Sequence, residues 1–115
     1  IDICDVVVIG YGDGRVEVIQ ALLAHPSLHD PQPKSEGGTQ AANSGHKGDP
    51  ALDTADWPEG RPGNLRVSYV LPSADWQVSG TGVFWPAPDD PLAELLGSDG
   101  LAAGPHRLVW LDIRR

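Results

Sequence analysis

The sequence has few basic residues, a single cysteine and no long apolar run. Eight Lys and Arg stand against sixteen Asp and Glu, for a formal net charge of −8. The summed field of such a chain repels a phosphate backbone, so nonspecific nucleic-acid binding is not expected. Cys4 cannot form an internal disulfide. The longest apolar run, residues 6–9, is far too short for a transmembrane helix or a signal peptide. We therefore expect a soluble chain with no membrane-inserted segment. The sequence does not indicate its cellular compartment.

The length of 115 residues allows one domain, complete or part of a larger one, and is too short for two ordinary ones. Apolar and β-branched runs predict strands over residues 4–9, 65–71, 77–85 and 107–113. Apolar residues at helical spacing predict a helix over 15–24. The series Asp90, Pro91 and Gly97 supplies the cap residues of a short helix around 92–96. The chain is thus expected to be α/β, with mainly antiparallel or mixed strands.

Residues 25–63 are rich in Pro, Gly, Ser, Asn and Asp, which predicts a long loop that Trp57 anchors to the core. In the strand predicted over residues 65–71, successive side chains point to opposite faces of the sheet. One face carries Leu65, Val67, Tyr69 and Leu71, and the other carries a lane of Arg66, Ser68 and Val70.

A glycine-rich turn, residues 10–14, lies between the first predicted strand and the first predicted helix. Backbone amides at such a turn can hold a phosphate, so a nucleotide-binding domain is one alternative. The dinucleotide fingerprint needs its third glycine where Arg15 stands, and Asp13 would bring a carboxylate close to the pyrophosphate. A plain strand-to-helix turn is the favoured interpretation.

The four histidines differ in their surroundings. His25, His29 and His46 lie in or beside polar loops without ligand spacing, and we expect no functional role for them. His106 opens an apolar strand, where the lane of Arg66 and Ser68 could face it. This makes His106 the candidate active-site residue.

Two stretches of the sequence carry a resemblance to a known family. They are NLRVSYVLPSADWQVSGTGVFWP, residues 64–86, and HRLVWLDI, residues 106–113. They resemble the C-terminal part of the endonuclease/exonuclease/phosphatase superfamily, in which a strand of the type Arg-Ile-Asp-Tyr-Val-Leu precedes a last strand that begins Ser-Asp-His. The residues that match are Arg66, Tyr69, Val70, Leu71 and His106. The resemblance covers most of the chain from about residue 6, which is less than half of a complete family domain.

The resemblance implies a fold and a reaction. The fold would be part of a two-sheet α/β sandwich, and the reaction would be hydrolysis of phosphate esters with Mg²⁺ or Mn²⁺, which neutralises charge on the transferred group. His106 would be the catalytic histidine, supported by Ser68 and Arg66, and Asp13 would be a displaced metal ligand. The substrate would be a phosphate ester.

The sequence also departs from the family pattern. Ser68 and Pro105 stand where the family has two aspartates, and the Gly-Asp-Phe-Asn motif that should follow the first strand is missing. Loss of an orienting carboxylate costs roughly 10⁴ in turnover in well-studied triads. We therefore expect a divergent or truncated phosphoesterase without activity as this chain alone. If it is active, the loop acids Asp53 and Asp56 are the candidate substitute ligands. The alternative is a noncatalytic interaction module on the same scaffold.

Overall fold

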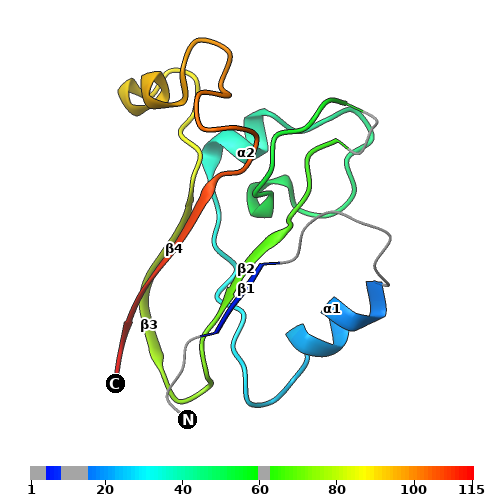
Figure 1. Cartoon of the computed structure of the whole chain (residues 1–115), viewed down its shortest axis with the longest axis vertical. Helices are drawn as coiled ribbons and strands as arrows, with labels where there is room; N and C mark the ends of the chain where they lie inside the picture. The colour runs from blue at the N-terminus through cyan, green and yellow to red at the C-terminus, as the bar shows by residue number, and fades with distance from the viewer. Residues whose placement is uncertain (1–4, 9–15, 60–62) are drawn as a thin grey trace.

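The computed structural model describes residues 5–8, 16–59 and 63–115 and shows a mixed α/β arrangement (Figure 1). In chain order the elements are β1 Asp5–Val8, α1 Val16–Leu23, α2 Glu36–Gln40, the 3₁₀ helix η1 Pro50–Leu52, β2 Ser68–Leu71, β3 Gln77–Phe84, the 3₁₀ helix η2 Pro91–Leu96 and β4 Leu108–Arg114. Within the described residues, no helix is long and apolar enough to cross a bilayer.

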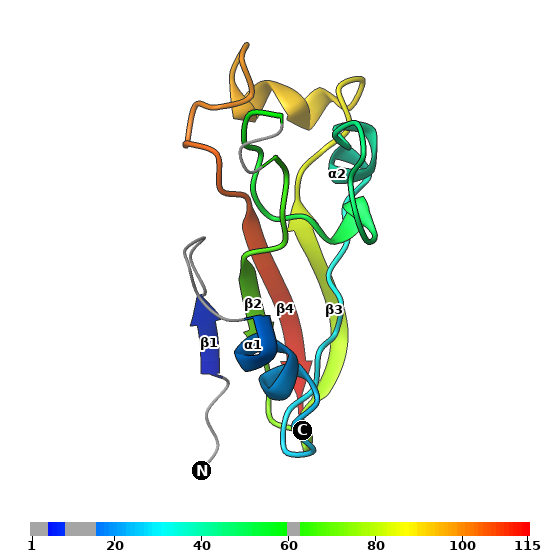
Figure 2. The same cartoon turned by 90° about the vertical axis from the view of Figure 1, so that its right-hand side faces the viewer.

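The strands pair antiparallel, as the sequence predicts. β1 pairs with β2, from Asp5 opposite Leu71 to Val8 opposite Ser68. β3 pairs with β4 in a longer ribbon that has Phe84 opposite Leu108 at one end. Figures 1 and 2 show α1 on one side of the β1–β2 pair and the β3–β4 ribbon on the other.

Two predicted elements need correction at their ends or in their type. The strand predicted over 65–71 is regular from Ser68 on, and Leu65 forms an isolated bridge with Ala55. The helix predicted over 92–96 is the 3₁₀ helix η2. Its predicted caps are confirmed: the Asp90 side chain accepts a hydrogen bond from the Leu92 amide at 2.9 Å, and Gly97 has a φ of 81°.

The segment 25–63 is not all loop, since it contains α2 and η1. Each begins with a side-chain cap: Ser35 Oγ accepts from the Gly38 amide, and Asp49 Oδ1 accepts from the Ala51 amide, both at 3.0 Å. Gly37 of α2 is buried against Trp85, where a Cβ atom would clash. Packing on the β3 end therefore decides this short helix, which has little propensity of its own.

The core gathers around β2 and the end of β3. The predicted alternation is confirmed from Val67 on, because Val67, Tyr69 and Leu71 are buried while Ser68 and Val70 are half-buried; Leu65, predicted on the buried face, is only half-buried. The other buried hydrophobic residues are Ala55, Val83, Trp85 and Ala87.

Candidate functional site

Residues 53–57, called here the junction segment, join the two strand pairs. Ala55 forms antiparallel bridges both with Leu65, which leads into β2, and with His106, which leads into β4. The Arg107 amide also donates to the Thr54 carbonyl at 2.8 Å. Both Thr54 and Ala55 are fully buried. A stretch that the composition marks as loop is thus an internal strand-like element.

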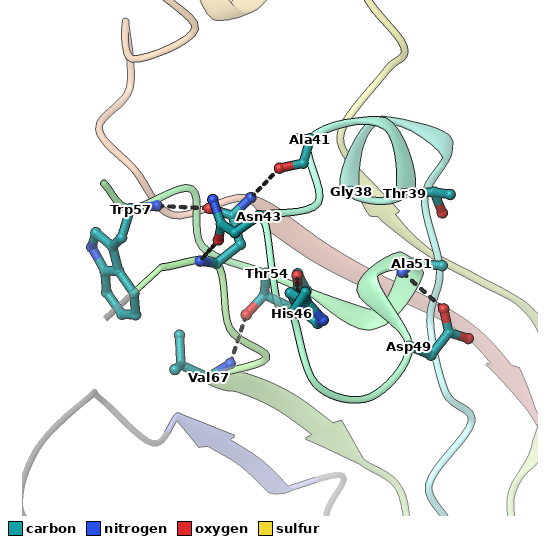
Figure 3. A network of polar contacts seen from close by, with 12 residues as sticks. Gly38, Thr39, Ala41, Asn43, His46, Asp49, Ala51, Thr54, Trp57 and Val67 are labelled. Atoms are coloured by element: carbon teal, nitrogen blue, oxygen red, sulfur yellow. Dashed lines mark hydrogen bonds and ion pairs between the residues drawn. The ribbon is translucent and has the colours of Figure 1, made fainter. Parts of the chain in front are cut away.

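The side chain of Thr54 fixes the start of β2. Its Oγ1 atom accepts hydrogen bonds from the amides of Val67 at 2.9 Å and Ser68 at 3.0 Å, and Figure 3 shows the first of these. These two amides lie just before and at the first residue of β2, and the threonine oxygen gives each of them an acceptor.

His106 lies at the head of β4 and is exposed. Its ring meets the Trp57 ring edge-on, with centroids 5.4 Å apart and an interplanar angle of 87°. The two bridges of Ala55 place Leu65 level with His106, and Ser68 stands three residues further along, about 10 Å at the rise of a strand. The structure brings the two strands together, but not the side chains of His106 and Ser68.

Arg66, one of the two predicted supporting residues, is paired with an acid. Its guanidinium holds the Asp30 carboxylate with two hydrogen bonds of 2.6 and 2.8 Å and lies 4.3 Å from the centroid of the Tyr69 ring. Burial raises the pKa of Asp30, but the hydrogen bonds from Arg66 and from the Gln32 amide outweigh burial and hold this pKa below its usual value.

A second histidine, which no sequence motif singles out, forms a buried pair. His46 Nε2 lies 2.6 Å from Asp53 Oδ2, with the two side chains only 10% and 3% exposed. Burial raises the pKa of the Asp53 carboxyl although the nearby imidazole favours its ionised form. The Nδ1 atom of His46 is buried without a partner in the structure. Two polar residues seven apart in a polar stretch carry no spacing signature, so only the fold reveals them.

The other acid of the junction segment is also paired. Asp56 Oδ2 lies 3.1 Å from the guanidinium of Arg107, whose side chain is 2% exposed. The same guanidinium donates to the Gly100 carbonyl at 2.8 Å and lies 4.7 Å from the centroid of the Trp85 ring. Burial lowers the pKa of Arg107, and Asp56 opposes that shift. Arg107 therefore links the junction segment, the loop after η2 and the end of β3.

Asn64 connects the loop after α2 to the junction segment. Its side chain donates to the Ala41 carbonyl and accepts from the Trp57 amide, both at 3.0 Å, while its own amide donates to the Asn43 side chain. Both the nitrogen and the oxygen of the Asn64 carboxamide are therefore hydrogen-bonded, and the side chain holds Trp57 in place beside His106.

The two acids predicted as substitute ligands for Mg²⁺ or Mn²⁺ both lie in the junction segment. Such ions take oxygen ligands that include one or two carboxylates. Asp53 is held by His46 and Asp56 by Arg107, so each already has a partner. No group of three His, Cys, Asp or Glu side chains that could hold a metal occurs in the part of the chain that the structure covers. Asp13 and the glycine turn 10–14 lie outside the described residues.

Comparison with protein-family models, with curated proteins and with solved structures finds no match. The chemistry of the junction segment and its neighbours is therefore the basis for a functional proposal.

Proposed function

We propose that this chain is a divergent or truncated member of the endonuclease/exonuclease/phosphatase superfamily and forms part of its two-sheet α/β sandwich. The ancestral reaction is hydrolysis of phosphate esters with Mg²⁺ or Mn²⁺, and His106 is the remnant of the catalytic histidine. We propose further that the chain by itself does not turn over such esters.

The observation that carries the proposal is the double bridge of Ala55. It sets the start of the Arg66-to-Leu71 strand beside the start of the strand that His106 opens. These are the two stretches on which the resemblance rests, and the family pattern needs them close together. The antiparallel strand pairs are compatible with a sandwich in which each pair belongs to one sheet.

The contacts of the candidate residues support the loss of activity. His106 has an aromatic ring as its neighbour, where a working general base has an orienting carboxylate. The cation of Arg66 is neutralised by Asp30, so it is not available for a phosphate. The two acids of the junction segment are also paired, Asp53 with His46 and Asp56 with Arg107. A working phosphate and metal site would require these pairs to break.

Hydrolysis of bis-p-nitrophenyl phosphate tests the proposal, with Mg²⁺ and then Mn²⁺ added to the chain and to its His106→Ala variant. We expect the two proteins to give the same background rate. A metal-dependent rate that His106→Ala abolishes would show that a working site exists and would overturn the claim of inactivity.

Kinship is tested separately by the coding sequence upstream of Ile1, which we expect to encode the family's other sheet and its metal-ligand glutamate. An unrelated upstream sequence would contradict a truncated family domain.

A further inference from the structure

A cavity of about 370 Å³ lies where α2, the residues after β3, η2 and the residue before β4 meet. Figure 2 shows α2 and η2 at the same end of the β3–β4 ribbon, so elements far apart in the sequence enclose this space. Binding sites for small molecules have volumes of roughly 300–1,000 Å³. The cavity, called here the η2 cavity, therefore has the size of a site for a small ligand.

One part of the wall of the η2 cavity is apolar. It consists of Trp85, Pro86 and Pro88, which follow β3, and of Ala93 and Leu96 in η2. A ligand gains free energy on this wall by burying aliphatic or aromatic surface. We therefore expect a ligand with an apolar body.

The charged part of the wall consists of Asp56 and Arg107. Asp56 uses its Oδ2 atom for Arg107, and its side chain is 34% exposed, so the carboxylate can be reached from the cavity. Arg107 uses Nη1 for the Gly100 carbonyl and Nη2 for Asp56. Its Nε atom is buried and has no acceptor among the described residues. The pair thus offers a ligand one acceptor, on Asp56, and one donor, on Arg107.

The opposite charges of this pair decide which ligands fit. A ligand with only a positive charge is repelled by Arg107, and a ligand with only a negative charge is repelled by Asp56. Such a repulsion is costly in a space that is shielded from water. A ligand with both charges close together can place its cation on the carboxylate and its anion on the guanidinium. An α-amino acid has this form, because one carbon atom carries both its ammonium and its carboxylate.

We propose that the η2 cavity binds a free α-amino acid with an apolar side chain. Its ammonium would donate to Asp56, its carboxylate would accept from Nε of Arg107, and its side chain would pack on Pro88 and Leu96. The proposal does not depend on phosphoester chemistry, because His106 does not line this cavity.

Isothermal titration calorimetry of the full chain with L-leucine tests the proposal. We expect saturable binding at millimolar concentration. L-Leucinamide lacks the carboxylate and 4-methylpentanoate lacks the ammonium, so each should bind about tenfold more weakly or less, through loss of a charged hydrogen bond. L-Glutamate keeps both groups but would bring a third charge to the apolar wall, and it should also bind more weakly.

Two pairs of variants locate the site. Ala93→Phe fills the cavity from η2 and should abolish binding, whereas Leu92→Phe changes an exposed neighbour of the same helix that does not line the cavity. Asp56→Asn removes the partner of the ammonium and should weaken binding by about tenfold. Asp89→Asn is its matched control, because Asp89 is exposed and lies outside the cavity. Both controls should change the affinity by less than about twofold.

Several outcomes would overturn the proposal. If leucine gives no saturable binding, the cavity is not an amino-acid site. Equal binding of leucinamide or of 4-methylpentanoate would mean that only one of the two charges is recognised. Unchanged binding by Ala93→Phe would place the ligand elsewhere. Thermal melts identify a variant that fails to fold. Ala93→Phe leaves the ion pair intact, and the ligand series on the parent protein decides even if both variants misfold.

Discussion

The imidazole of His46 lies 2.6 Å from the carboxylate of Asp53, and both side chains are buried beside the segment that joins the two strand pairs. The contact connects the loop after α2 to the only acid of the junction segment that has no arginine partner. It therefore stabilises the same junction that positions His106, without taking part in the proposed chemistry.

Removing the two partners of this pair should have unequal effects. His46→Ala leaves the buried Asp53 carboxyl without its hydrogen-bond partner and should reduce the free energy of unfolding by about 2–3 kcal/mol at neutral pH. Asp53→Asn removes the charge together with the need for a counter-charge, and should cost about 1 kcal/mol. Urea denaturation of both variants measures the difference. Equal losses would show that the pair acts only through packing.

The pH dependence of the His46→Ala variant follows from the raised pKa of Asp53. Because the folded state holds the Asp53 proton to a higher pH than the unfolded state, this group stabilises the fold at acid pH and loses that effect as the pH rises from about 3.8 through its folded pKa. Without His46 the pKa rises further. The free energy of unfolding that His46→Ala loses relative to the parent protein should therefore be largest at pH 7 and shrink towards pH 4. A loss that grows towards pH 4 would contradict a raised pKa of Asp53.

Asp30→Asn tests a carboxyl whose pKa is shifted in the opposite direction from that of Asp53. The pKa of Asp30 is lowered in the fold, so its ion pair with Arg66 stabilises the protein above the ordinary value of 3.8 and is lost as the pH falls through the folded pKa. We expect a loss of about 1–3 kcal/mol at pH 7, and little difference from the parent protein near pH 2. Arg66→Lys, which keeps the charge but not the paired hydrogen bonds, is the control and should lose part of this amount. Chemical denaturation at both pH values provides the measurement.

Thr54→Val tests the junction itself. The substitution keeps the shape of the side chain but leaves the buried amides of Val67 and Ser68 without their common acceptor. We expect a loss of about 2–4 kcal/mol, because two buried donors lose their partner. Thr54→Ser keeps the oxygen and should cost less. If Thr54→Val costs no more than Thr54→Ser, the two hydrogen bonds to the hydroxyl contribute little to stability.

Gly37→Ala tests the packing of α2 on the end of β3. Alanine favours an isolated helix by about 1 kcal/mol over glycine. Here its Cβ would meet the ring and carbonyl of Trp85 and come within 2.7 Å of the Pro86 carbonyl oxygen, so we expect a net destabilisation of about 1–3 kcal/mol. Gly45→Ala is the comparison, because its Cβ enters open space and its cost comes from a φ of 74° alone. Thermal melts distinguish the two, and a stabilised Gly37→Ala would contradict the packing.

The sequence predicted best where the signal is local. The alternation of Val67, Tyr69 and Leu71 reflects a two-residue period that needs one buried face and no knowledge of the partner strand. The caps of η2 are equally local, since Asp90 and Leu92 are two residues apart. The end of the regular ladder at Ser68 could not be read in the same way, because it depends on Leu65 pairing with a distant residue.

By itself, the sequence determined a mixed α/β chain with mainly antiparallel or mixed strands, its acidic charge and the place of His106 just before the last strand. Only the tertiary structure decided that Thr54 and Ala55 are buried between two strands, that Arg66 turns to Asp30, and that His46 meets Asp53. The physical reason is that these contacts join residues far apart or without a periodic pattern. Their hydrogen bonds exist only once the backbone has brought the partners together, so neither composition nor spacing records them.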